Sequence, residues 1–584
     1  MKLTLKTYVT GFVLAGALVI GCQSMYSAQQ GGTGADATPT PTPDGADNAI
    51  GFFVDGSHNV TGGGPPPTAD EIAEEGEETQ SHFRAIQIDP GLEDTAGPKF
   101  LKAVDFDGDG LLDILSGHNQ SQPVQLHLQR RVNGSISFET VTLGGTFPIA
   151  TMAGVDIADI DQDGALDVVV LVKHNGTLAF CLDGQVYEPG YTGEIIILFS
   201  PPPGGDITDG DAWQQVRIQD SNSTIDRRWG RTVESDRAID YPEDGGYTSL
   251  SVADIDGLNG PDIIVTSNVS EIPCNTGQNV VAVWLNPGAN ARNGNSQNIT
   301  GANPPALTTP PTFWYPIWVD IDAPVVKDSE VMDVDGDGDI DIIAAYSNAI
   351  TQNVRWYRNP LIEQGAAAVS AGVFMNSNAA RYATNWELRP VGQLDGNVGA
   401  IALGDMDGDG FDDILARSTG TNVAVWFRRP TTNTNIEPIF PPNLAPDPVR
   451  VNFPWQVYAL DDYDRFRANG IAIGDLTTNG ANNAAVAVGG RLLWYDHTIS
   501  DSGSVFDEWG PDFVLDDTKE QGTTDDPTSL QFADDGTLIN NLLIVDLDGD
   551  GLNDIIATFD RRVASGVTDD EIVWFRNTLK DEAE

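Results

Sequence analysis

Five copies of one nine-residue acidic pattern carry the clearest chemistry in this sequence of 584 residues. Each copy has Asp at positions one, three, five and nine and Gly at position six. A tight loop with this spacing turns several carboxylates inward, and Ca²⁺ takes about six to eight such oxygen ligands in irregular geometry. No copy contains His or Cys, so a softer metal is not expected. The carboxylates are Asp105, Asp107, Asp109 and Asp113; Asp159, Asp161, Asp163 and Asp167; Asp333, Asp335, Asp337 and Asp341; Asp405, Asp407, Asp409 and Asp413; and Asp546, Asp548, Asp550 and Asp554.

The remaining loop positions agree with calcium. A backbone carbonyl at position seven can add an oxygen, and Gly at position six allows a sharp turn. A plain Asp-Gly turn is the simpler interpretation of any single copy. Five copies in matched surroundings favour about five calcium sites that stabilise the fold. The residues at position seven are Leu111, Ala165, Asp339, Phe411 and Leu552.

Two further copies have fewer carboxylates. One keeps Asp254, Asp256 and Asp262 but has Leu258 at position five, so we expect weaker metal binding there. The other begins at Asp475 and has Thr or Asn at the remaining three ligand positions. We expect that loop to be held by hydrogen bonds without a metal.

The seven loops have similar surroundings. A short apolar stretch precedes each loop, and a β-branched or apolar run follows it. Two more short stretches come next and often contain Trp, as in residues 354–357 and 386–391. Four short strands per unit are typical of a β-propeller blade. The sequence therefore predicts an all-β, seven-bladed β-propeller of four-stranded antiparallel blades, with most Trp side chains in the core between blades.

The seventh unit lacks its fourth strand. Only residues 577–584 follow its Trp574 stretch. Residues 82–88 resemble the fourth stretch of the second unit, residues 213–220. We therefore predict that this N-terminal strand completes the last blade, which leaves no free sheet edge between the first and last blades.

In this blade context, the loops resemble FG-GAP/VCBS repeats, the calcium-binding propeller units of integrin α subunits and many bacterial surface proteins. The resemblance covers about residues 81–577. It implies the propeller fold and calcium in the loops. The same scaffold serves adhesion proteins, receptors and some carbohydrate-active enzymes, so the resemblance leaves the function open.

The N-terminus predicts export. Residues 1–21 combine early Lys residues with a short apolar run, which is typical of a secretory signal. Residues 19–22, Val-Ile-Gly-Cys, are similar to a bacterial lipobox, which implies a lipid on Cys22; an ordinary signal peptide is the alternative. Residues 22–80 are rich in Pro, Gly, Thr and acid and predict a disordered tether, and residues 578–584 form a tail. We expect a bacterial lipoprotein, periplasmic or at the cell surface, that touches the membrane only through its lipid.

Composition narrows the possible partners. The chain has 86 Asp and Glu against 31 Lys and Arg, for a formal charge of −55. Such a surface repels phosphate, so nucleic acid is not an expected partner. No Gly-x-Ser-x-Gly elbow, His-Glu-x-x-His motif or P-loop is present, so catalysis is not the leading function.

Ligand-binding candidates lie on the face opposite the acidic loops, where the second strand of each unit ends. His118 and His174 follow these strands in units one and two, and Arg417 does so in unit five. Solvated loop ends are the alternative interpretation of each position.

Two other features belong to this face. The connection between units two and three could recognise carboxylates or sugar faces, or only neutralise local acids, through Arg227, Arg228, Trp229 and Arg231. Cys181 and Cys274 fall in equivalent connections of neighbouring units, either as a disulfide or as two free thiols.

Three functions follow from these features. The leading hypothesis is a lipid-anchored, calcium-stabilised binding or adhesion module for a protein or glycan, working as a monomer. The second is a carbohydrate-active enzyme, similar to a polysaccharide lyase, on the same scaffold. The third is a purely structural surface protein.

Overall fold

The computed structural model describes most of the repeat region. The described residues are 83–89, 98–118, 124–144, 150–174, 180–182, 185–187, 194–220, 247–267, 279–296, 313–347, 352–361, 385–394, 397–418, 423–430, 455–462, 468–478, 480, 482–488, 491–499, 505–515, 538–562 and 568–579. All of them belong to one compact unit, Ile50–Glu584. Among them, no helix has the length and apolar character needed to cross a membrane. The expected signal, Cys22 and the tether lie outside the described residues and stay predictions.

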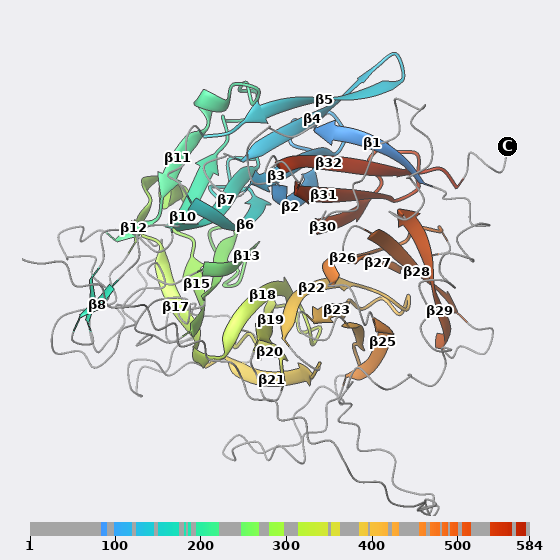
Figure 1. Cartoon of the computed structure of the whole chain (residues 1–584). Helices are drawn as coiled ribbons and strands as arrows, with labels where there is room; N and C mark the ends of the chain where they lie inside the picture. The colour runs from blue at the N-terminus through green and yellow to red at the C-terminus, as the bar shows by residue number, and fades with distance from the viewer. Residues whose placement is uncertain are drawn as a thin grey trace, which may run out of the picture. The chain divides into compact units, whose positions relative to one another are not determined.

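Seven four-stranded antiparallel sheets form the blades of a β-propeller, as predicted (Figure 1). From the innermost strand outward, blades one to three are β2 (Pro98–Val104), β3 (Asp113–His118), β4 (Gln125–Val132) and β5 (Ser135–Thr142); β6 (Ala150–Ala158), β7 (Asp167–His174), β10 (Glu194–Phe199) and β11 (Gln214–Arg217); and β13 (Tyr247–Ala253), β14 (Asp262–Ser267), β15 (Asn279–Leu285) and β17 (Tyr315–Ala323).

Blades four to seven repeat this order. They are β18 (Val325–Met332), β19 (Asp341–Ser347), β20 (Val354–Arg358) and β21 (Glu387–Gly392); β22 (Val398–Gly404), β23 (Asp413–Ser418), β24 (Val423–Arg428) and β25 (Gln456–Asp462); β26 (Ala468–Gly474), β27 (Asn483–Val488), β28 (Arg491–Ile499) and β29 (Val505–Leu515); and β30 (Leu538–Val545), β31 (Asp554–Arg562), β32 (Thr568–Asn577) and β1 (Phe83–Asp89).

Small elements lie between the blade strands. They are the hairpin β8 (Phe180–Leu182) and β9 (Gln185–Tyr187), the parallel pair β12 (Gln219–Asp220) and β16 (Asn295–Ser296), and the 3-10 helices η1 (Gly210–Ala212) and η4 (Gly288–Asn293).

The N-terminal strand closes the ring, as predicted. Strand β1 pairs antiparallel with β32, so that Phe83 faces Asn577 and Ile86 faces Trp574. Figure 1 shows blue β1 alongside red β32. Because β1 is the outermost strand of blade seven, the first and last parts of the propeller share one sheet.

The innermost strands contact one another in order around the ring. Near its start, each of them has a break in register with the second strand of its blade. The residue left between the paired positions is Lys99 in β2 and Lys327 in β18. A β-bulge re-aims the side chain at such a position. The sequence pattern did not predict these bulges.

The hydrophobic core lies between blades. One cluster joins Leu126 of blade one to Val168 of blade two, and another joins Trp356 of blade four to Ile414 of blade five. The prediction for the Trp residues is confirmed by nine that are buried: Trp213, Trp284, Trp314, Trp356, Trp386, Trp426, Trp455, Trp494 and Trp574.

A buried polar network links blade one to the closing strand. The Ser116 hydroxyl lies 2.9 Å from Nε2 of both His118 and His127. Nδ1 of His127 lies 3.0 Å from the Thr140 hydroxyl and 3.6 Å from a carboxylate oxygen of Asp89, the last residue of β1. The two imidazoles therefore share one hydroxyl at the junction where the ring closes.

This network predicts acid sensitivity. Burial lowers the pKa of both His118 and His127 from about 6.5 to about 4. The unfolded chain therefore binds these protons more readily than the folded protein, so stability falls as pH drops from 6.5 towards 4. With calcium saturating, we expect the melting temperature of His127→Gln to fall less steeply between pH 6.5 and pH 5 than that of the unsubstituted protein. Parallel melting profiles would contradict this role of His127.

Candidate metal centres

The acidic loops connect the first and second strands of each blade, and their backbone is tightly turned. Gly110 at position six of the first loop has φ of 86°, and its counterparts in the other complete loops are also left-handed. Position four is left-handed as well, with Gly108 at 74° and Gln162 at 60°. Glycine adopts this conformation freely. The requirement at position four was not recognised from the sequence.

The carboxylate at position one organises the turn. In the first loop, Oδ1 of Asp105 accepts hydrogen bonds from the backbone N–H groups of Gly108 at 2.7 Å and Asp109 at 3.1 Å. Its Oδ2 accepts from the N–H of Gly110 at 2.9 Å. The same contacts recur around Asp333. The loop therefore wraps its own backbone donors around its first carboxylate.

The side chain at position nine is buried and ties the loop to the third strand. Oδ2 of Asp341 accepts from the N–H of Val334 at 3.0 Å, and Oδ1 accepts from the N–H of Asn359 at 2.7 Å. Burial raises the pKa of Asp341 to about 8, and that of Asp413 likewise to about 8. A carboxylate in this setting keeps its charge at neutral pH only if a cation is close.

Positions one, three and nine converge. In at least five loops of the described part of the chain, one oxygen from each of these carboxylates lies within 4.8 Å of the others: Asp105, Asp107 and Asp113; Asp159, Asp161 and Asp167; Asp254, Asp256 and Asp262; Asp333, Asp335 and Asp341; and Asp405, Asp407 and Asp413. Oδ1 of Asp161 and Oδ1 of Asp335 are buried with no hydrogen-bond donor among the described residues. Orphaned buried carboxylate oxygens beside two other acids fit a hard divalent cation such as Ca²⁺.

One arginine contacts the carboxylates at positions three and five of each complete loop. In the first loop Arg130 contacts Asp107 at 2.6 Å and Asp109 at 3.9 Å. In the fourth loop Arg358 contacts Asp335 at 2.5 Å and Asp337 at 3.2 Å. The same arrangement joins Arg292 to Asp161 and Asp163, Arg428 to Asp407 and Asp409, and Arg576 to Asp548 and Asp550. Every complete loop therefore has its own fixed cation, the guanidinium of its paired arginine, which we did not predict from the sequence.

The two incomplete loops differ in a consistent way. In the third loop, Leu258 replaces the carboxylate at position five, and no arginine pairs with the loop among the described residues. Burial raises the pKa of Asp256 there to about 7. In the sixth loop, Asn483 carries no charge, but its Oδ1 accepts a hydrogen bond from the N–H of Leu476 at 2.8 Å. Asp475 accepts from Thr477, Thr478 and Gly480. Asn479 lies outside the described residues.

Side-chain amides link the loops of four blades to the loop of the preceding blade. Nδ2 of Asn359 donates to the carbonyl of Ile340 in its own blade at 2.9 Å and to that of Ile255 in blade three at 3.0 Å. Gln129, Asn286 and Asn577 make the same pair of contacts. A signal for three of these amides was present, because an Asn follows Trp284, Trp356 and Trp574 by two or three residues.

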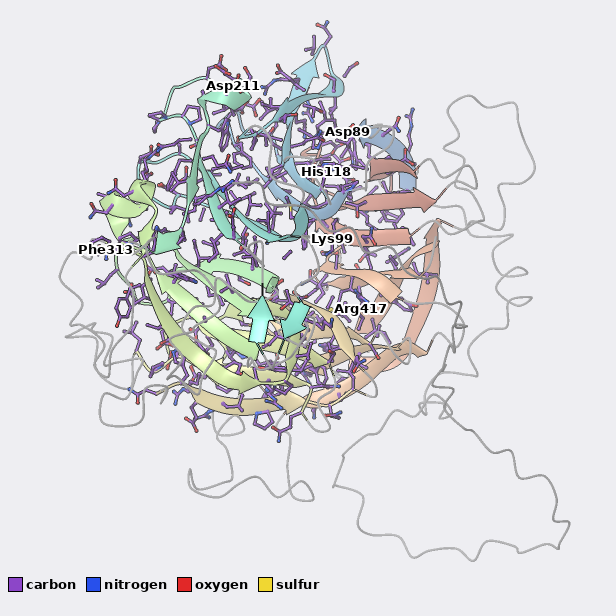
Figure 2. The ribbon with its side chains drawn as sticks, turned by 60° about the vertical axis from the view of Figure 1, so that its left-hand side comes forward. Asp89, Lys99, His118, Asp211, Phe313 and Arg417 are labelled. Atoms are coloured by element: carbon purple, nitrogen blue, oxygen red, sulfur yellow. The ribbon has the colours of Figure 1, made fainter. Side chains whose placement is uncertain are left out.

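The other candidate residues are dispersed. His118 is buried beside Ser116, and Figure 2 shows it in blade one, away from the labelled Arg417. Arg417 lies in β23, and burial lowers its pKa to about 10. His174 ends β7 and Cys181 lies in β8, but their side chains are outside the described part of the chain. Arg227, Arg228, Trp229, Arg231 and Cys274 also lie outside it.

The fold, the acidic loops and one family match indicate the class of protein. The fold and the loops define a seven-bladed β-propeller built from acidic-loop repeats. Residues 105–170 match the family model of the FG-GAP-like repeat, and together with the seven blades this match supports an FG-GAP repeat β-propeller. No curated protein sequence matches the chain.

Two solved structures resemble the chain at low similarity. A crystal structure of BBS1N in complex with ARL6DN, soaked with lead, is 10% identical, covers 86% of this chain and 99% of that chain, and has a TM-score of 0.39. The same complex soaked with mercury is 11% identical with the same coverage and a TM-score of 0.37. At these scores, the similarity carries no conclusion about what this chain binds.

The paired arginines predict a coupling between charge and calcium. Removing Arg358 takes away the fixed cation of one loop, so Arg358→Gln should melt at a lower temperature than the unsubstituted protein in EDTA. The same loop becomes more negative, so it should bind Ca²⁺ more tightly and lose less stability when calcium saturates. Melting curves and calcium titrations measure both effects. Arg217→Gln, which removes an arginine paired with Glu194 away from the loops, is the control. Equal losses with and without calcium would refute the coupling.

Proposed function

We propose that this chain is a calcium-stabilised protein-binding module. The observation that carries the proposal is the recurrence of the same acidic loop at the same place in an FG-GAP repeat propeller. The polar groups of such a loop are used in contacts within the propeller. The carboxylate of Asp341 accepts backbone hydrogen bonds, and the amide of Asn359 donates to the loop of the preceding blade. Such loops suit a scaffold that is stabilised by metal ions, so a protein partner would bind to other surfaces of the propeller.

The calcium ions are proposed to be structural. Positions one, three and nine would hold each ion, with the position-five carboxylate and the position-seven carbonyl as further oxygens. A cation that binds only the folded state stabilises it by about 2.7 kcal/mol at a hundredfold excess over its Kd. Four carboxylates occupy positions one, three, five and nine of each complete loop, so one calcium ion and one arginine together leave a single negative charge at these positions. The proposal is about five such ions per chain.

The partner surface is proposed to lie on the face opposite the acidic loops. There the innermost strands begin and the second strands end, and the connections differ in length from blade to blade. Variable connections on a rigid scaffold are the usual place for recognition. A protein is the proposed partner class, and a glycan is the alternative that the test separates.

Binding can be tested with the exported form of the full chain. We expect it to bind one or more members of an array of extracellular proteins when calcium is present and to lose that binding in EDTA as the fold loosens. A glycan array run in parallel is the comparison. Binding to glycans alone, or protein binding that is unchanged in EDTA, would contradict the proposal.

We further propose that a lipid on Cys22 anchors the module to a membrane, since the lipobox-like residues 19–22 follow a signal-like segment. Cys22→Ala should move the protein from the membrane fraction to the soluble fraction without changing its melting temperature. Cys181→Ala is the matched control because it leaves the N-terminus intact. Unchanged membrane association of Cys22→Ala, measured by fractionation and immunoblotting, would refute the anchor.

A further inference from the structure

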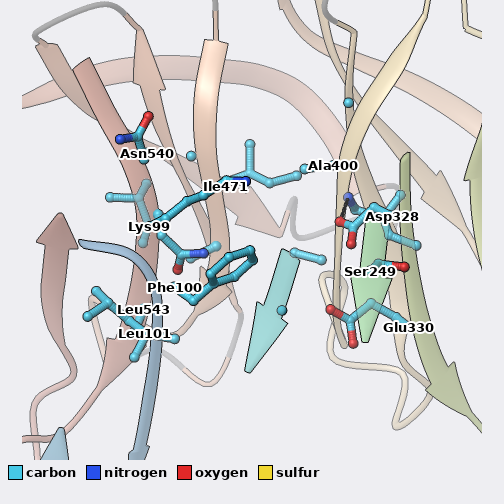
Figure 3. A pocket seen from close by; sticks show the side chains of 18 of the residues that line it. Lys99, Phe100, Leu101, Ser249, Asp328, Glu330, Ala400, Ile471, Asn540 and Leu543 are labelled. Carbon is cyan, nitrogen blue, oxygen red and sulfur yellow. Dashed lines mark hydrogen bonds between the residues drawn. The ribbon is translucent and has the colours of Figure 1, made fainter. Parts of the chain in front are cut away.

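A cavity of about 560 Å³ lies at the centre of the propeller and is lined by the innermost strands of all seven blades. Its volume falls in the range of small-molecule sites, about 300–1,000 Å³. Figure 3 shows Lys99, Phe100 and Asn540 on one side and Ser249, Asp328 and Glu330 on the other. The cavity is formed by the innermost strands and not by the acidic loops, so it needs its own explanation.

The lining of this cavity has more basic than acidic residues, although the chain as a whole is strongly acidic. Four bases line it, Lys99, Lys102, Lys327 and Arg417, against two acids, Asp328 and Glu330. The whole chain has 86 acids and only 31 bases. A local excess of positive charge in so acidic a protein favours an anion at this site.

The β-bulges turn two of these bases towards the cavity. Lys99 and Lys327 each occupy the bulged position of an innermost strand, next to the paired residues Phe100 and Asp328. Bulges of this kind re-aim a side chain and are common beside functional sites. Other bulged positions are small or polar: Ala153, Thr248, Gly399 and Asn540.

Two of the bases are balanced by neighbouring acids. Nζ of Lys102 lies 3.0 Å from Asp156, whose other carboxylate oxygen accepts from the N–H of Val252 at 2.8 Å. Asp328 accepts from the N–H of Ile401 at 3.0 Å and lies near enough to Arg417 to raise that residue's pKa against the lowering effect of burial. Burial also raises the pKa of Glu330, to about 8. The other two bases of the lining are Lys99 and Lys327.

These two lysines lie on opposite walls. Lys99 belongs to blade one and Lys327 to blade four, with Arg417 in blade five. In a seven-bladed ring, the boundary between blades four and five is diametrically opposite blade one. Lys99 donates to the Met152 carbonyl at 3.4 Å, and Lys327 has no ion pair or hydrogen bond among the described residues. Because these bases lie on opposite walls, a ligand with two separated anionic ends is suited to contact both.

We propose that the central cavity binds a small dicarboxylate that bridges the two walls. One carboxylate is held by Lys99, and the other by Lys327 with Arg417. Its carbon chain lies between Phe100 and the small or aliphatic residues Ala400 and Ile471, which face the same space (Figure 3). Charge-assisted hydrogen bonds from Lys and Arg to carboxylates are among the strongest polar contacts in proteins.

Calorimetric titration of the full chain at saturating calcium and low salt tests this site. The probes are succinate, glutarate and adipate, with acetate and the neutral diamide succinamide as controls. We expect one dicarboxylate length to bind with a single site per chain, at least about tenfold more tightly than acetate, and succinamide not to bind. Acetate binding as tightly as the best dicarboxylate, or no dicarboxylate binding at all, would overturn the proposal.

Matched variants separate the site from general charge effects. Lys99→Gln with Lys327→Gln should weaken the best dicarboxylate by about tenfold or more, and the Lys→Arg pair should retain binding. Arg84→Gln removes one positive charge from an exposed position in β1 and should leave the affinity unchanged. Melting curves confirm that each variant is folded. Unchanged affinity in the folded Gln pair would also overturn the proposal, whatever the outcome for the partner module.

Discussion

Six of the seven blades depend on a buried Asp at the ninth loop position that accepts hydrogen bonds from two backbone N–H groups at once. Asp341 accepts one hydrogen bond from its own loop and one from the residue after the third strand. Asn483 keeps the loop contact in the sixth loop, where the charge is lost. The hydrogen bonds fix the loop on the sheet, but a carboxylate there is expensive to ionise because it is buried. The rest of the loop can be understood as a response to that buried charge.

The response has two parts that vary together. The five loops with Asp at position five each face an arginine, and the two loops without it have no such pair among the described residues. A divalent cation would serve positions one, three and nine, while the guanidinium holds the outer oxygens of positions three and five. The amides of Gln129, Asn286, Asn359 and Asn577 connect blades one, three, four and seven to the loop of the preceding blade. The conformation of one loop therefore affects the next blade.

The sequence allowed the repeat, the seven blades, the closing strand and the buried Trp residues to be predicted, because each leaves a local pattern that recurs. The arginines were not predicted, although Arg358, Arg428 and Arg576 each follow a Trp by two residues. Arg292 instead reaches a loop of another blade 131 residues earlier in the chain. His118 was placed at a strand end, but its burial beside His127 depends on contacts across blade one. The bulges at Lys99 and Lys327 interrupt strand pairing without altering the alternation of residue types. Long-range packing, rather than local propensity, decides these features.

The closing strand also has a consequence for the order of events during synthesis. Strand β1 leaves the ribosome first among the propeller strands, yet its partner β32 leaves last. Phe83 therefore cannot pair with Asn577 until β32 has been made. Pairing across so long a separation is slow, because loop closure must precede the contacts that reward it. A nascent or truncated chain therefore presents an unpaired edge strand until β32 has been made. Closure of the ring requires residues up to Asn577, so a product interrupted before them keeps an exposed sheet edge.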